Sequence, residues 1–137
     1  MPAIPVLLKS TKWRYLATAS SSTYTQSFDT VFEDCERVDY IVLAHASVGA
    51  VLDVTIATDS SGTSPTDLGA SITVDTAGKL YVITISPAIL TSTKQYVSAK
   101  VTRSAGTYSL VEVRYNLRDK NQFTQDTSVA SITKYLT

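Results

Sequence analysis

Alternation of apolar and polar residues with a period of two runs through the middle of the chain and predicts β-strands. From Val38 to His45 apolar side chains fall on both faces, which is typical of a strand in the middle of a sheet. Val51 to Thr58 is apolar on one face only, through Leu52, Val54 and Ile56, and predicts a half-buried strand. The other predicted strands are Trp13–Thr18, Tyr24–Phe28, Ile72–Val74, Leu80–Ser86, Tyr96–Arg103 and Tyr108–Tyr115.

Short turn sequences between these strands predict how they are joined. Thr76–Lys79 and Ser104–Thr107 each link two strands into a predicted hairpin, whereas Asp59–Ser71 is expected to be a surface loop rather than a linker. Seven or eight short strands predict an all-β fold, a single antiparallel β-sandwich or jelly roll. Its expected core residues are Val42, Leu52, Val54, Ile56, Val82, Ile83, Ile85, Val97, Val101, Val111 and Val113.

The two ends of the chain lack this pattern. We expect residues 1–12 and 119–137 to be extended N- and C-terminal arms of a β-sandwich domain at 13–118. The helical spacing of Val129, Ile132 and Leu136 predicts a short amphipathic helix or a segment that orders on a partner; covering the domain's own sheet edge is the alternative. The predicted interface residues are Ile4, Val6, Leu7, Leu8, Trp13, Phe123, Val129, Ile132, Tyr135 and Leu136.

Composition supports a folded β-rich domain and argues against several partners. Of 137 residues, 44% are hydrophobic and 18% charged, and 20 Thr, 14 Val and 8 Ile make β-branched residues abundant. A net charge of zero predicts no general attraction to nucleic acid or to an anionic membrane. Met1–Leu8 has no basic segment before it and contains two prolines, so we expect neither a signal peptide nor a membrane helix.

The zero net charge hides two oppositely charged halves. Residues 1–75 carry nine acids and four bases, a net of −5, and residues 76–137 carry eight bases and three acids, a net of +5. If the two halves stay apart in space, opposite surfaces favour head-to-tail contacts between copies. If the strands of the two halves interleave, the asymmetry disappears.

No residue pattern predicts catalysis. His45 is the single histidine and Cys35 the single cysteine, and acidic neighbours of Cys35 disfavour its thiolate. A lone cysteine excludes an internal disulfide and suits synthesis in a reducing cytoplasm. The loop at Asp59–Asp67 has oxygen ligands for calcium, but its spacing does not match a calcium-binding loop, so a solvated loop is the simpler interpretation. We therefore expect no enzymatic activity, no cofactor and no metal site.

The order of strands and turns from Phe28 to Arg118, about two thirds of the chain, resembles that of capsid decoration, or cement, proteins and other head-associated structural proteins of tailed bacteriophages. The resemblance rests on a pattern of strands and turns. The segments that carry it are Tyr40–Leu43, Val51–Ile56, Asp59–Gly62, Thr76–Ile83, Gln95–Val101 and Tyr115–Arg118.

This resemblance implies a structural virion protein that folds in the host cytoplasm and binds the outside of a capsid, which it stabilises. The implied partners are the major capsid protein and other copies of this chain, with a homotrimer expected and the arms making the contacts. The alternative is a carbohydrate- or receptor-binding β-sandwich module of a phage fibre or tail, which exposed coplanar aromatic rings around Trp13, Tyr24 and Tyr108 would favour.

Overall fold

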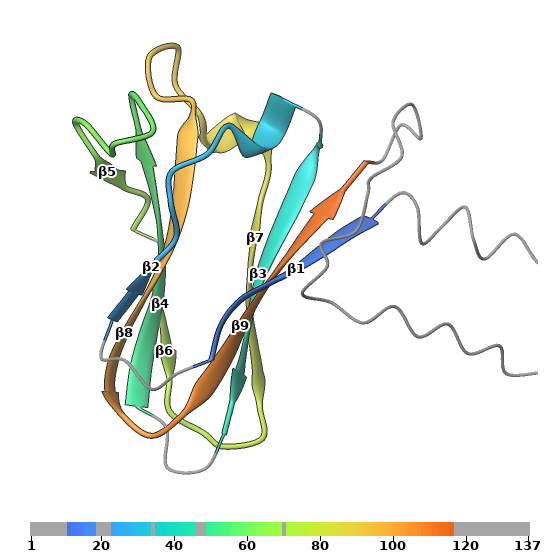
Figure 1. Ribbon diagram of the computed structural model, residues 1–137, viewed down its shortest axis with the longest axis vertical. Helices are drawn as coiled ribbons and strands as arrows, with labels where there is room; N and C mark the ends of the chain where they lie inside the picture. The colour runs from blue at the N-terminus through green and yellow to red at the C-terminus, as the bar shows by residue number, and fades with distance from the viewer. Residues whose placement is uncertain (1–10, 19–22, 34, 46–48, 70, 117–137) are drawn as a thin grey trace, which may run out of the picture.

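The computed structural model describes residues 11–18, 23–33, 35–45, 49–69 and 71–116, and these form two antiparallel β-sheets packed face to face (Figure 1). The strands are β1 (Thr11–Thr18), β2 (Thr23–Thr25), β3 (Arg37–Ala44), β4 (Gly49–Ala57), β5 (Thr66–Asp67), β6 (Ile72–Val74), β7 (Leu80–Ile85), β8 (Tyr96–Ala105) and β9 (Tyr108–Tyr115). Two 3-10 turns, η1 (Val31–Glu33) and η2 (Pro87–Ile89), lie between strands. No helix among these residues is long and apolar enough to cross a membrane.

The strand order is that of a jelly roll. Sheet A has the order β1-β9-β3-β7, and sheet B has the order β2-β8-β4-β5, with β6 also paired to β4. The pairs β1–β9, β2–β8, β3–β7 and β4–β6 show that the chain doubles back on itself as a long ribbon, which then winds around one core. The predicted all-β sandwich is confirmed.

Both predicted hairpins are wrong. The turn Thr76–Lys79 leads from β6 in sheet B to β7 in sheet A, and Ser104–Thr107 leads from β8 in sheet B to β9 in sheet A. Each turn is therefore a corner between layers. Gly78 and Gly106 have the positive φ angles, 82° and 71°, that a tight reversal requires. A reversal of chain direction has this sequence signature whether the next strand pairs within the sheet or crosses to the other one.

Alternate residues of each strand fill the space between the sheets. Most of the predicted core is confirmed there, with relative exposures of 0–6% for Val42, Leu52, Val54, Ile56, Ile83, Ile85, Val97 and Val101. The prediction of burial is wrong for Val82, whose side chain is 44% exposed, and Val111 is only half-buried. Adjacent strand residues point to opposite faces, so Val82 and Ile83 cannot both enter the core. Val113 is buried as predicted, but on the outer face of sheet A, where it pairs with Trp13.

A buried polar network joins the two sheets beside this core. The Glu112 carboxylate of β9, fully buried, accepts hydrogen bonds from Gln26 Nε2 at 2.7 Å and from Arg114 Nε at 2.8 Å. Arg114 also donates to Asp29 Oδ2 at 2.9 Å. Gln26 follows β2 and hydrogen-bonds to the backbone of Ala99 in β8. Because every partner in the chain of contacts is charged or polar, the buried carboxylate is compensated.

The network and the strand order also show where the acidic and basic halves of the sequence lie relative to each other. Strands from the acidic half pair with strands from the basic half in both sheets, as β3 does with β9 and β4 with β8. Asp53 lies opposite Lys100, and Asp29 forms an ion pair with Arg114. The halves therefore interleave, and the sequence asymmetry gives no support to head-to-tail contacts.

Replacing Glu112 tests how much the network stabilises the fold. Glu112→Gln keeps the shape of the side chain but leaves the buried Arg114 guanidinium with only half-exposed Asp29 as an ionic partner. We expect a loss of about 3–5 kcal/mol in the free energy of unfolding, measured by urea denaturation, since breaking a buried pair leaves the remaining buried charge without sufficient compensation. Glu33→Gln, the same change at an exposed site, is the control and should leave the free energy of unfolding nearly unchanged. Equal losses in the two variants would show that the network is dispensable.

Candidate interaction surface

The outer face of sheet A carries apolar side chains across all four of its strands. Residues directly paired across neighbouring strands point to the same face of the sheet. One such row crosses the sheet from β1 to β7 and consists of Tyr15, Val111, Ile41 and Val82. Rows on either side extend it. We call this surface the sheet A face; its apolar members are Trp13, Tyr15, Ile41, Leu43, Leu80, Val82, Val111 and Val113.

Most of these side chains are accessible to solvent. Leu80 is 64% exposed, Val82 44% and Trp13 41%; Tyr15 and Leu43 are also exposed, and Ile41 and Val111 are half-buried. Scattered apolar residues are normal on a protein surface, but a contiguous set spanning one sheet marks an interaction site. The sheet A face is therefore the first candidate for function.

Polar groups border the sheet A face at one end. Asp39 is almost fully buried there and is held by Arg37, Thr84 and Tyr115, whose donors lie 2.7–3.1 Å from its carboxylate oxygens. The Arg37 guanidinium also stacks on the Tyr115 ring. Burial raises the pKa of Asp39, but the Arg37 hydrogen bonds and the other donors outweigh burial and hold the pKa below its ordinary value. This end of the face is therefore charged, and its carboxylate is fully hydrogen-bonded within the sheet.

The outer face of sheet B has the opposite character. The same pairing rule places buried Ala57 opposite half-buried Tyr96 at one end of this face. It gives three further rows, and all but one of their members are polar. Threonine predominates, and Val51 is the apolar exception. The rows are Thr23, Thr102, Val51 and Thr73; Thr25, Lys100 and Asp53; and Ser98, Thr55 and Asp67. The sandwich thus has one apolar and one polar outer face.

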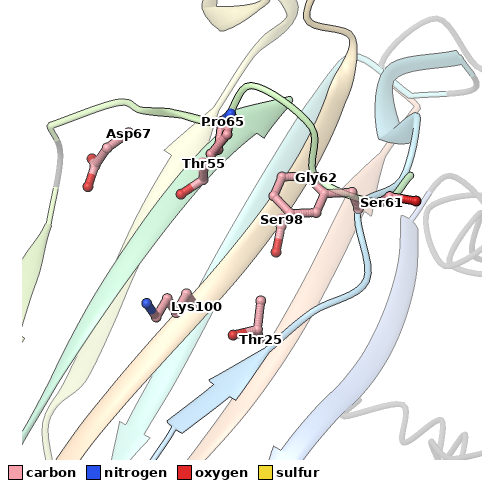
Figure 2. Close-up of a pocket in the computed structure, with 9 residues that line it drawn as sticks. Thr25, Thr55, Ser61, Gly62, Pro65, Asp67, Ser98 and Lys100 are labelled. Carbon is pink, nitrogen blue, oxygen red and sulfur yellow. The ribbon is translucent and has the colours of Figure 1, made fainter. Parts of the chain in front are cut away.

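A hollow of about 400 Å³ lies on the outer face of sheet B, beneath the loop between β4 and β5 (Figure 2). Sheet residues form its floor, and Phe28 and the loop form its walls. Asp59 fixes the loop, because its Oδ1 accepts hydrogen bonds from the backbone N–H groups of Ser61 and Thr63 at 3.0 and 3.1 Å. We call this hollow the Lys100 pocket; it is lined by Thr25, Phe28, Thr55, Ser61, Gly62, Pro65, Asp67, Ser98 and Lys100.

Two carboxylates lie close together at the edge of the Lys100 pocket. Burial and the adjacent Asp67 raise the pKa of Asp53, whereas the hydrogen bond with Asp53 and the backbone N–H of Gly69 lower the pKa of Asp67. The Lys100 charge acts on both groups and favours their ionised forms. The pair therefore holds a proton more readily at Asp53 than at Asp67.

Of the ten residues predicted to make contacts, Trp13 is the one that the structure describes, and it lies on the sheet A face. The other nine, Ile4, Val6, Leu7, Leu8, Phe123, Val129, Ile132, Tyr135 and Leu136, lie outside the described residues. Sequence reasoning did not assign Leu43, Leu80 or Val82 to a surface. The signal was present, since Val38–His45 is apolar on both faces and only one face can enter the core.

The two residues considered for chemistry, Cys35 and His45, each make a hydrogen bond within the fold. Cys35 is buried and donates to the Val31 carbonyl at 2.8 Å, and the His45 ring contacts the Ser109 hydroxyl at 2.9 Å. Among the described residues no cluster of three or more His, Cys, Asp or Glu side chains could hold a metal ion. Tyr108 is fully buried and Tyr24 packs against the core, so with Trp13 they do not make the exposed aromatic platform considered from the sequence.

Comparison with models of protein families, with curated proteins and with solved structures finds no match to this chain.

The carboxylate pair gives a pH-dependent prediction. Because the pKa of Asp53 is higher in the folded protein than in the unfolded chain, its ionisation at neutral pH opposes folding, and this cost disappears below about pH 4. Asp53→Asn should therefore raise the thermal midpoint at pH 7 and leave it unchanged at pH 3, as measured by circular dichroism. Asp59 is the matched control, because hydrogen bonds from Thr63 and its neighbours lower its pKa; Asp59→Asn should lower the midpoint at pH 7. A lower midpoint at pH 7 in Asp53→Asn would refute the assigned direction.

Proposed function

We propose that this chain is a structural virion protein that binds the outside of a phage capsid through the sheet A face. The observation that carries the proposal is the contrast between the two outer faces, apolar on sheet A and polar on sheet B. A protein that attaches to a shell needs one face for the shell and one for the solvent. The resemblance of the strand and turn pattern to capsid decoration proteins supplies the kind of partner.

The energetics of burial favour a protein surface as that partner. Fully burying a side chain such as Leu80 or Val82 contributes about 1.5–3 kcal/mol, whereas an exposed ion pair contributes about 0–1 kcal/mol and is screened by salt. Association costs several kcal/mol in lost motion, so several apolar side chains must be buried together. The contiguous rows of the sheet A face meet this requirement.

The position of the chain ends supports contacts between copies. Thr11, the first residue of β1, is paired with Tyr115, the last of β9, so residues 1–10 and 117–137 join the sandwich at the same end of sheet A. In the proposal, capsid-bound copies form a homotrimer, and the apolar residues Ile4, Val6, Leu7 and Leu8 of one copy lie on its neighbour.

Co-sedimentation with capsid shells prepared without this chain tests the proposal. We expect the double variant Leu80→Lys and Val82→Lys to bind at least about tenfold more weakly, because a change of about 1.4 kcal/mol is tenfold in affinity. The matched control is Thr73→Lys with Thr102→Lys, which adds the same charge to the outer face of sheet B and should bind as the wild type does.

Further measurements test the contribution of the N-terminal arm and that of the sheet A face separately. Deletion of residues 1–8 should weaken attachment more than moderate salt does, since apolar burial is not screened. The proposal fails if both lysine pairs bind equally well, or if the Thr73 and Thr102 pair alone loses binding. Thermal midpoints of all variants show whether each remains folded.

A further inference from the structure

We propose that the Lys100 pocket on the outer face of sheet B binds a neutral, hydroxyl-rich ligand, the terminal sugar of a glycan. Its volume of about 400 Å³ is at the small end of the range of ligand pockets, about 300–1,000 Å³, and suits one or two sugar rings. The pocket lies on the sheet opposite to the proposed capsid contact, so the two proposals are independent.

The floor of the pocket is a regular array of polar groups. Thr25 is paired with Lys100, and Ser98 with Thr55, so these four side chains occupy two adjacent rows of the sheet. Paired side chains are about 5 Å apart at Cβ. The Thr25 and Thr55 hydroxyls both donate and accept, the ammonium donates, and the Asp67 carboxylate accepts. The buried Ser98 hydroxyl already donates to the Gln26 carbonyl at 2.6 Å. Such an array matches the hydroxyl groups of a sugar ring, each of which is also a donor and an acceptor.

Several of these groups are available to a ligand. Within the described residues, the Thr25 and Thr55 hydroxyls and the Lys100 ammonium form no hydrogen bond or ion pair. The Asp67 carboxylate is partly used, since its Oδ1 accepts from the backbone N–H of Gly69 at 2.7 Å and it shares a hydrogen bond with Asp53. Figure 2 shows Thr25, Thr55 and Lys100 around one opening, below the loop that carries Gly62 and Pro65. A ligand that binds through Thr25, Thr55 and Lys100 therefore breaks no internal hydrogen bond.

The walls of the pocket are apolar and already in place. Gly62 has a φ angle of 78° and lies so close to the Phe28 ring that an added Cβ would be 2.6 Å from its Cε2 atom. The loop is further tied by the Thr58 N–H, which donates to the Thr63 carbonyl at 3.0 Å. Aromatic and proline side chains contact the C–H faces of sugars, and a loop fixed in advance lowers the entropy cost of binding.

Charge excludes the other ligand classes. A phosphate would meet the Lys100 ammonium but also the carboxylates of Asp53 and Asp67, which lie near that ammonium. A metal ion or an organic cation would in turn meet the ammonium in the floor. A neutral ligand encounters neither repulsion and uses both donors and acceptors.

Titration of the 15N-labelled protein with the methyl glycosides of glucose, galactose, mannose and N-acetylglucosamine tests the proposal. We expect at least one sugar to give saturable amide shifts at Gly62 and Lys100 in the millimolar range, as few hydrogen bonds on an open site imply. Thr55→Val and Lys100→Met should each weaken binding about tenfold. Thr73→Val, on the same face but outside the pocket, should not change it.

Inorganic phosphate is the charge control and should give no saturable shift. The inference is overturned if none of the four sugars gives saturable shifts, if Thr55→Val binds as the wild type does, or if phosphate binds in a Lys100-dependent way. Capsid co-sedimentation of Thr55→Val should remain normal in every case, because the substitution is remote from the sheet A face.

Discussion

A two-layer sandwich buries only one face of each sheet, and this constraint governs the whole molecule. Sheet B meets it simply, with aliphatic residues such as Leu52 and Val101 inside and threonine outside. Sheet A does not, because β3 and β9 carry apolar side chains on both faces and sheet B can cover only one. The uncovered side chains, Leu43 and Val111 among them, remain at the surface and are the physical basis of the proposed attachment.

The sandwich also buries charged side chains, and polar partners within the protein compensate for the cost of that burial. Glu112 and Arg114 point inward from β9, where an unpaired ion would cost several kcal/mol. Gln26 and Asp29, from the segment after β2, supply their partners and so tie sheet B to sheet A. Burial, together with the Glu112 carboxylate, raises the pKa of the Tyr40 hydroxyl well above its ordinary value, which keeps that group neutral inside the sandwich. The positions of these buried polar side chains, as well as their polarity, therefore determine how the two sheets pack against each other.

The sequence predicted the class of fold better than its connections. Period-two alternation located the long strands, because Leu52, Val54 and Ile56 can share only one face. It did not show which sheet a strand joins, because turns such as Thr76–Lys79 reverse the chain equally well at a hairpin and at a corner. Burial of Val82 was predicted wrongly for a related reason: alternation assigns residues to faces but does not say which face is covered.

The Lys100 pocket could not be predicted from the sequence. Its floor comes from β2, β4 and β8, and its wall depends on the approach of Gly62 to Phe28, 34 positions earlier in the chain. Only the paired register brings Thr25 beside Lys100. The sheet A face, by contrast, was present in the sequence as the two-sided apolar strand Val38–His45.

Chemical footprinting of single cysteines tests most directly whether the sheet A face is the contact surface. In a Cys35→Ser background, Val82→Cys places a thiol on the sheet A face and Thr102→Cys places one on the outer face of sheet B. The rate of maleimide modification is compared for free and capsid-bound protein. If capsids bind to the sheet A face, binding strongly protects position 82 and leaves position 102 unprotected. Protection at position 102 with an unchanged rate at position 82 would contradict this prediction.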